Sequence, residues 1–220
     1  MTYSIIAREP ATEELGVAVA SRFFAVGAMV PHVRGGKGAV ATQAAVNPLW
    51  GLDAADRMAQ GEVPGDILAD LVACDDGAVV RQIHMIDAAG RHAAHTGADC
   101  VDWCGDAAAD NVSVAGNMLV GEGVVADTLA TYVAHPELSL AERLMLAMEA
   151  GAAAGGDKRG TQSAALVIHL RGRIVHFMDY APTRANPSAQ VDRAALEARI
   201  EEADAKRFAA GVKSRSFATP

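Results

Sequence analysis

The sequence predicts an α+β fold: a four-layer αββα sandwich, with two mostly antiparallel sheets stacked between two helix layers. Stretches with the short apolar pattern of strands arrive in adjacent pairs joined by turns. Stretches with helical periodicity also arrive in consecutive pairs, between the strand pairs. Helices inserted in pairs between hairpins suit stacked layers, whereas a doubly wound sheet would alternate strand and helix. No linker or internal repeat is visible, so we expect one domain over residues 1–220.

The first part of the chain reads as hairpins followed by two helices. Residues 2–8 and 15–21 are rich in apolar residues and flank the polar turn EPATEE, which predicts the first hairpin. The elements expected next are a third strand within 24–34, a fourth strand over 39–46, and helices over 48–62 and 63–76. Pro48 and Pro64 each stand where the first turn of a helix accepts proline.

The second part repeats this arrangement. The expected elements are strands over 79–87, 92–97 and 110–119, helices over 121–136 and 139–155, strands over 163–170 and 173–180, and a helix over 188–208. The acidic segment 99–111 reads as a loop. Ser139, followed three residues later by Glu142, is the pattern of a capping box at a helix start.

Composition and charge narrow the class of protein. The formal net charge is -8 and no stripe of Lys and Arg interleaved with aromatic residues is present, so we expect no nucleic-acid partner. The apolar runs are short, which predicts no membrane-spanning helix, and the N-terminus does not resemble a secretory signal. Three cysteines do not make a disulfide framework, so a reducing cytoplasm is expected. The small-residue-rich, apolar-leaning composition leads us to expect a homodimer.

Thr2 opens the first predicted strand. If Met1 is removed, Thr2 carries a free amine and a hydroxyl on one residue, the smallest nucleophile-plus-base unit that a protein can make. The pKa of an α-amino group is about 7.7–8.0, so part of it is unprotonated at neutral pH and can take the hydroxyl proton. The alternative is that Thr2 is only the first residue of a strand.

The opening segments resemble a known superfamily. TYSIIAR, a turn and LGVAVASRF are similar to the first hairpin of proteasome β-subunits, which are N-terminal nucleophile (Ntn) hydrolases. A wider set of segments resembles more closely DUF1028, a bacterial family of unknown function in the same superfamily: TYSIIAREPATEELGVAVASRFFAVGAMVP, AVATQAAVNP, HTGADC, GNMLVGE and GGDKRGTQSAAL. That resemblance covers nearly the whole chain. It brings no established reaction, but the superfamily implies hydrolysis of an amide by Thr2 through an acyl-enzyme.

The resemblance also implies supporting residues. Superfamily members place an Asp in the loop that corresponds to GGDKRGTQ, followed three residues later by a small or hydroxyl residue, and Asp157 and Gly160 match that spacing. Ser163 ends the same loop. Loops at the position of residues 116–118 supply oxyanion-hole donors in the superfamily, and Asn117 carries an NH₂ donor there. We therefore predict that Asp157, Asn117 and Ser163 support Thr2.

Two positions depart from the proteasome pattern. Those subunits carry an acidic residue after the second strand and a lysine on the third, which by position would fall near residues 21–22 and 32–34. Neither residue type is present there. Arg22 and Arg34 could instead supply the positive field that lowers the pKa of the amine, or they form ordinary ion pairs.

Substrate contacts are predicted from the polar residues around the same loops. Convergence of Arg22, Arg34, Lys158 and Arg159 near the nucleophile would favour a carboxylate-bearing small amide, such as an amino-acid or peptide derivative. Gln43, in the predicted fourth strand, is a buried amide that needs partners. It is either a structural contact or a substrate contact.

Metal and cofactor sites are not expected. His95, Cys100 and Cys104 offer one close Cys pair, whereas a zinc ribbon needs two, and no phosphate-binding loop is present. His84, inside a strand pattern, reads as a hydrogen-bonded core residue. Two functional hypotheses follow: an amidohydrolase that uses Thr2, or a non-catalytic Ntn-fold protein that binds a ligand and keeps Met1. The N-terminal residue in the native host distinguishes them.

Overall fold

The structure, a computed structural model, describes residues 2–171 and 173–180. The first sheet contains β1 (Thr2–Glu9), β2 (Glu14–Ser21), β7 (Trp103–Ala109), β8 (Val112–Leu119), β9 (Ser163–Leu170) and β10 (Arg173–Tyr180). The second sheet contains β3 (Pro31–Arg34), β4 (Gly38–Ala44), β5 (Arg81–Asp87) and β6 (His92–Thr96). The helices are α1 (Pro48–Ala59), α2 (Pro64–Ala73), α3 (Gly123–Ala134) and α4 (Leu140–Ala153), with 3₁₀ turns η1 (Val26–Ala28) and η2 (Ala78–Val80).

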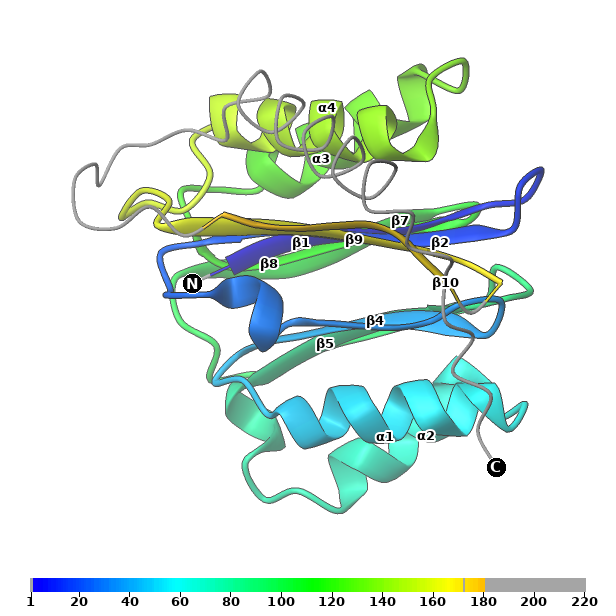
Figure 1. Ribbon diagram of the computed structural model, residues 1–220. Helices are drawn as coiled ribbons and strands as arrows, with labels where there is room; N and C mark the ends of the chain where they lie inside the picture. Colours follow the sequence, from blue (N-terminus) through cyan, green and yellow to red (C-terminus); the bar gives the residue numbers. More distant parts are fainter. Residues whose placement is uncertain (1, 172, 181–220) are drawn as a thin grey trace.

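The two sheets are antiparallel and lie face to face (Figure 1). The strand order is β10-β9-β2-β1-β8-β7 in the first sheet and β3-β4-β5-β6 in the second. Helices α3 and α4 cover the outer face of the first sheet, and α1 and α2 cover the outer face of the second (Figure 1). The predicted four-layer αββα sandwich is therefore confirmed, with Thr2 at the start of a strand in the interior of its sheet.

Alternation along β1 decides which way Thr2 faces. Tyr3 and Ile5 belong to the apolar core that the first sheet shares with α3 and α4. Ile6 belongs to the apolar core between the two sheets. Because successive side chains of a strand point to opposite faces, Thr2 and Ser4 share the inter-sheet face with Ile6.

The helix starts follow local sequence signals. The side chain of Asn47 accepts a hydrogen bond from the backbone N–H of Leu49 at 3.1 Å, and Pro48 is the first residue of α1. At α4, the hydroxyl of Ser139 accepts from the N–H of Glu142, and the Glu142 carboxylate accepts from the N–H of Ser139. The capping box predicted from the sequence is therefore present, and it ties down the first turn of α4.

The third strand expected within 24–34 is confirmed, and it is short: Pro31–Arg34 pair with β4. A turn at residues 24–25 and then η1 precede it. The backbone of Ala25 has a φ of 52°, in the left-handed region, which a regular strand does not permit. The helix predicted over 188–208 lies outside the described residues. Among the helices of the described part of the chain, none is both long and apolar enough to span a membrane.

Segment 99–111, predicted to be a loop, contains the edge strand β7. Its residues include Gly105, Asp106 and three consecutive alanines, all of low intrinsic strand preference. The strand forms because β8 offers it a hydrogen-bonding edge, with Asp106 opposite Ala115. Pairing with a residue nearby in space therefore overrides the local preference.

Gly97 is a position where a side chain would not fit. A Cβ added there would lie 2.3 Å from the carbonyl oxygen of Val79 and 2.4 Å from that of Ala78. Both are backbone atoms of η2, so Gly97→Ala is expected to lower the free energy of unfolding by about 1–3 kcal/mol. The control is Gly65→Ala in α2, where nothing lies within 4 Å and the helix gains up to about 1 kcal/mol. Chemical denaturation measures both, and equal stability of the two variants would contradict the argument.

Candidate active site at the start of β1

Four polar side chains form a row across four neighbouring strands of the first sheet. Thr2 lies opposite Asn117 of β8 on one side and opposite Ser21 of β2 on the other. Ser21 in turn lies opposite Ser163 of β9. All four residues are buried, and Thr2 has 5% of its surface exposed. Because directly opposed residues share a face, the row points toward the second sheet.

The hydroxyl of Thr2 contacts the hydroxyl of Ser21, with 3.0 Å between Oγ1 and Oγ; either atom can be the donor. Ser21 was not among the predicted catalytic residues. A serine hydroxyl is not a base at neutral pH. The contact can therefore orient the Thr2 hydroxyl, but Ser21 cannot be the base that removes its proton. A base for Thr2 must therefore be another group, and the α-amine of a Met1-free chain is bonded to the same Cα.

Asn117 belongs to a buried amide cluster between the sheets. Its Nδ2 donates to Oε1 of Gln82 at 2.9 Å. The Nε2 of Gln82 donates to Oγ1 of Thr96 at 2.9 Å and to the carbonyl of Gly116 at 2.8 Å. One of the two hydrogens of the Asn117 NH₂ group is thus bonded to Gln82, so only the other is left for the predicted role as an oxyanion donor. Its Oδ1 is buried and has no hydrogen-bond partner among the described residues.

Gln43 links the two sheets. Its Oε1 accepts from Oγ of Ser4 at 2.8 Å, and its Nε2 donates to Oε1 of Gln82 at 2.8 Å and to the carbonyl of Ala115 at 3.2 Å. Only 1% of Gln43 is exposed. Both ends of the amide are thus used within the protein. Of the two roles expected for Gln43, the structure favours the structural contact over the predicted contact with substrate.

His84 continues the same cluster. Its Nε2 lies 2.8 Å from Oγ of Ser4, and its Nδ1 lies 2.9 Å from Oγ of Ser113. Burial lowers the pKa of His84 to about 3, because charging the ring inside the protein is unfavourable. The imidazole is therefore neutral at neutral pH, as expected for a hydrogen-bonded core residue.

Asp157 anchors the end of β2. Its Oδ2 accepts from the backbone N–H of Arg22 at 3.0 Å, and its Oδ1 accepts from the N–H of Arg159 at 2.8 Å. The side chain is fully buried. Burial, and secondarily the nearby Asp157 carboxylate, raise the pKa of Tyr3, the neighbour of Thr2. Asp157 therefore lies beside the start of β1 and holds the residue that follows Ser21.

Ser163 forms hydrogen bonds to the backbone of the segment that follows β2. Its hydroxyl donates to the carbonyl of Phe23 at 2.6 Å and accepts from the N–H of Val26 at 3.0 Å. These bonds fasten the segment that follows β2. Ser163 is two strands away from Thr2, which corresponds to about 10 Å at the usual strand spacing. Ser21 lies between the two residues, so the predicted support of Thr2 by Ser163 would have to act through Ser21.

Three of the four predicted cationic residues lie together beside Asp157. Nη1 of Arg22 donates to the carbonyl of Arg159 at 2.6 Å. The guanidinium of Arg159 approaches the Asp157 carboxylate at 3.5 Å, and the ammonium of Lys158 pairs with Asp102. Arg22 forms no ion pair with a described residue. Of the three, Arg22 is thus the one whose charge no described carboxylate balances.

Arg34 lies elsewhere, and its predicted convergence with the other cations is wrong. It pairs opposite Gly38 at the start of β4, whereas Gln43, near the Thr2 end, is five residues further along that strand. Five residues of strand span about 16 Å. Nη2 of Arg34 lies 2.7 Å from Oδ1 of Asp56, and burial, with Arg34 as a second cause, lowers the pKa of His169 near the far end of β9. Arg34 is therefore too far from Thr2 to lower the pKa of its amine or to bind a substrate there.

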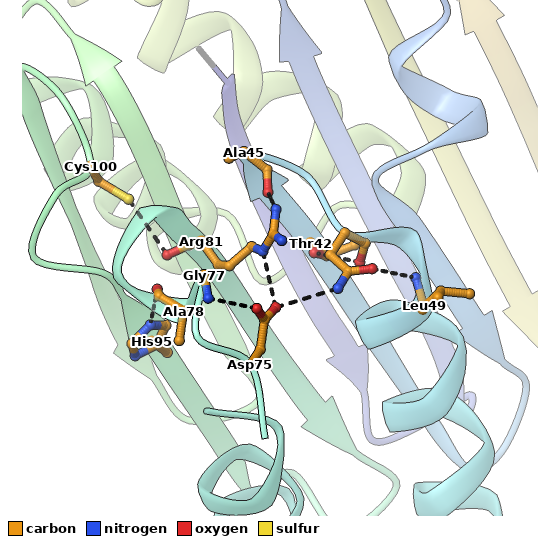
Figure 2. A network of polar contacts seen from close by, with 10 residues as sticks. Thr42, Ala45, Leu49, Asp75, Gly77, Ala78, Arg81, His95 and Cys100 are labelled. Atoms are coloured by element: carbon orange, nitrogen blue, oxygen red, sulfur yellow. Dashed lines mark hydrogen bonds and ion pairs between the residues drawn. The ribbon is translucent and has the colours of Figure 1, made fainter. Parts of the chain in front are cut away.

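The loops at the Thr2 end of the second sheet are joined by a polar network around Asp75 (Figure 2). Its Oδ1 accepts from the N–H of Gly77 at 2.7 Å, and its Oδ2 accepts from Nε of Arg81 at 3.2 Å and from Nδ2 of Asn47 at 3.5 Å. Nη1 of Arg81 donates to the carbonyl of Ala45 at 2.5 Å. The bond from Gly77, ahead of those from Arg81, lowers the pKa of Asp75. The network connects the end of β4 and the starts of α1 and β5.

Several segments at this end of the sandwich carry exposed apolar side chains. We call this set the apolar rim; its members are Phe23, Phe24, Leu49, Val79, Val101 and Val120. Each lies in a segment that follows or precedes a strand end carrying the polar row or the amide cluster. The end of the sandwich at which β1 begins therefore carries both these exposed apolar side chains and the cations beside Asp157.

The residues that resemble a partial zinc motif have protein partners. Nε2 of His95 lies 2.9 Å from the carbonyl of Ala78, and Sγ of Cys100 lies 3.5 Å from the carbonyl of Arg81 (Figure 2). Sγ of Cys104 lies 3.6 Å from the carbonyl of Cys100. Within residues 2–171 and 173–180, no three His, Cys, Asp or Glu side chains are grouped so that they could hold a metal ion.

Comparisons with known proteins agree with the expected family. No curated protein matches the chain. The crystal structure of the protein SPO2555 from Silicibacter pomeroyi, described as a DUF1028 protein, matches with a TM-score of 0.80 and 27% identity, over 94% of this chain and 89% of that one. Anbu, an ancestral β-subunit from Yersinia bercovieri, matches far more weakly, with a TM-score of 0.43 and 9% identity, over 99% of this chain and 100% of that one. The model of the family of unknown function DUF1028 matches residues 2–206. The chain therefore belongs to the DUF1028 family.

Proposed function

We propose that the chain, once Met1 is removed, is an amidohydrolase in which Thr2 is the nucleophile. One observation carries the proposal: the Thr2 hydroxyl stands at the head of an interior strand, held by Ser21 at 3.0 Å and flanked by the amide of Asn117. A threonine that only began a strand would not need a buried hydroxyl partner on one side and an unsatisfied amide oxygen on the other.

The proposed reaction uses only groups of Thr2 and water for its proton transfers. The neutral α-amine takes the proton from Oγ1 as Oγ1 attacks the amide carbon of the substrate. The resulting ammonium returns that proton to the leaving nitrogen, the C–N bond breaks, and an ester to Thr2 remains. Water, deprotonated by the same amine, then attacks the ester, and Oγ1 leaves with the proton. The contact with Ser21 keeps Oγ1 in place through both steps.

The surroundings favour an amide with an apolar group and a carboxylate, such as an N-acyl amino acid. The apolar rim suits the acyl chain. Arg22 follows Ser21 directly and makes no ion pair with a described residue, so it is the cation that we assign to the carboxylate. Lys158 and Arg159 are balanced by Asp102 and Asp157 and serve as weaker candidates.

The first experiment measures the N-terminus. Intact-mass analysis of the protein isolated from its native host is expected to show loss of Met1. Incubation with N-acyl amino acids is expected to release the free acid and amine, and rapid acid quench should trap a mass increase equal to one acyl group. Full retention of Met1, together with ligand binding but no turnover, would instead support the non-catalytic alternative.

The assignment of Arg22 gives a specificity prediction. Arg22→Gln is expected to raise KM for an N-acyl amino acid about tenfold or more, since a bond between charged groups is lost. The corresponding N-acyl amino-acid amide, which lacks the carboxylate, should show little change in KM. Arg34→Gln is the matched control, because Arg34 lies at the other end of β4 and should leave both values unchanged. An equal rise in KM for both substrates would remove Arg22 from the carboxylate site.

A further inference from the structure

The Oδ1 of Asn117 is a buried acceptor that has no partner among the described residues. Asn117 as a whole has 1% of its surface exposed. Folded proteins rarely leave such an atom unpaired, and each case calls for a physical explanation, of which a catalytic role is one. The donor that could meet Oδ1 depends on which way the Asn117 amide is oriented.

The neighbours of Asn117 determine its orientation. The amide nitrogen of Gln82 contacts the carbonyls of Gly116, at 2.8 Å, and Gly105, at 3.2 Å. A carbonyl can only accept, so Nε2 must point that way and Oε1 of Gln82 must point toward Asn117. An acceptor there requires the NH₂ group of Asn117, at 2.9 Å. Oδ1 is therefore on the other side of the amide, away from Gln82.

The hydrogen-bond directions in the rest of the amide cluster are also determined by backbone carbonyls, which can only accept. Nε2 of Gln43 contacts the carbonyl of Ala115 at 3.2 Å, so its Oε1 accepts the single hydroxyl proton of Ser4. Nε2–H of His84 must then donate to Ser4, and the hydroxyl of Ser113 donates to Nδ1 of His84. Each donor in this series of hydrogen bonds thus has one consistent direction. The series runs from β8 through β5, β1 and β4 and back to β5. It ends at Gln82 and holds that side chain in place.

We propose that Oδ1 of Asn117 accepts a hydrogen bond from the α-amine of Thr2 that is freed when Met1 is removed. Thr2 and Asn117 are directly opposed in adjacent strands and share the inter-sheet face. The Cα atoms of opposed residues in an antiparallel pair are about 4.5–5.5 Å apart. Because the amine is bonded to the Cα of Thr2, it lies within reach of the side-chain amide of Asn117. The inference rests on the proposed function, since it assigns Asn117 as the positioning residue of the base in that reaction.

The bond would direct the lone pair of the amine. A neutral amine has two hydrogens and one lone pair, and fixing one hydrogen on Oδ1 limits where the lone pair can point. An orienting partner of this kind is the third member of a nucleophile, base and orienter set. The same acceptor also stabilises the ammonium form and so raises the pKa of the amine relative to that in a site without it.

The experiment measures the pKa of the Thr2 amine in Met1-free protein without any substrate. The rate of amine acylation by a small anhydride is followed against pH, with the N-terminal peptide quantified by mass spectrometry. Asn117→Ala is expected to lower the pKa by about one unit, because an acceptor is lost. Asn117→Asp is expected to raise it by about one unit or more, because a carboxylate takes the place of the amide.

The control is Thr128→Val, which removes a buried hydroxyl that bonds the carbonyl of Val124 within α3, on the other side of the first sheet. Its amine pKa should equal that of the wild type. Two variants with opposite expected signs keep the test decisive if one of them does not fold. An unchanged pKa in a folded, Met1-free Asn117 variant would overturn the inference even if Thr2 proved to be the nucleophile. Shifts of the expected sign would uphold it even if no amide were hydrolysed.

Discussion

In the Met1-free protein, Thr2→Ala is expected to abolish amide hydrolysis, with kcat reduced on the order of 10⁴–10⁶-fold, whereas Thr2→Ser retains measurable turnover. Alanine has no nucleophile, and serine keeps the hydroxyl beside the same amine. Serine lacks the methyl group that limits rotation of the threonine side chain, so a loss of about 10–100-fold relative to the wild type is expected for Thr2→Ser. Steady-state hydrolysis of an N-acyl amino acid measures all three proteins.

Two controls make the comparison interpretable. Intact mass must show that Met1 is absent from every variant, because a peptide nitrogen is not a base and a Met1-bearing wild type should be inactive. Thermal unfolding must show that each variant is folded, since Thr2 is buried and bonded to Ser21. Equal turnover by Thr2→Ala and wild type would reject Thr2. Ser21, whose Oγ is 3.0 Å from that of Thr2, would then be the next hydroxyl to replace.

Local patterns predicted most of the fold because the signals lie close together in the sequence. The first hairpin is an example: the apolar runs 2–8 and 15–21 flank a short polar turn, and the structure pairs them in one continuous register from Glu9 opposite Glu14 to Thr2 opposite Ser21. Extending the hairpin symmetrically from its turn would have placed Ser21 beside Thr2. The capping box of Ser139 and Glu142 was equally local and was found.

The features of the fold and of the candidate site that the sequence did not predict depend on contacts between residues far apart in the sequence. Strand β7 forms because β8 pairs with it, and its own residues carry little strand preference. Arg34 was expected near Thr2, but the register of β3 with β4 places it at the other end of the sandwich. The amide cluster joins Gln43, Gln82 and Asn117 across two sheets, and no spacing along the chain predicts these contacts. A strand pattern indicates a buried face but does not say which opposing side chain it meets.

Acidification is expected to destabilise the protein through His84. The ordinary pKa of histidine is about 6.5, and burial lowers the pKa of His84 to about 3 in the folded state. Between these values the unfolded chain binds a proton that the folded chain does not. The free energy of unfolding is therefore not reduced by His84 above about pH 6.5. As the pH falls from there toward 3, it decreases by about 1.4 kcal/mol per pH unit. From pH 6.5 to pH 5 the free energy of unfolding should fall by about 2 kcal/mol from this residue.

The window from pH 7 to pH 5 isolates histidines, because carboxylates with lowered pKa values, such as Asp75, lose their contribution only below about pH 4. Urea denaturation at several pH values gives the slope, and His84→Gln is expected to remove most of it. The pKa values of His32 and His169 are also lowered, first by burial, but both rings are less buried, so His32→Gln and His169→Gln should each keep most of the slope. If His84→Gln does not fold, NMR titration of the His84 ring in the wild type decides, since the ring should remain neutral down to pH 4. Protonation of that ring above pH 5 in the folded protein would mean that the donor chain through Ser4 and Ser113 opens far more easily than its buried hydrogen bonds imply.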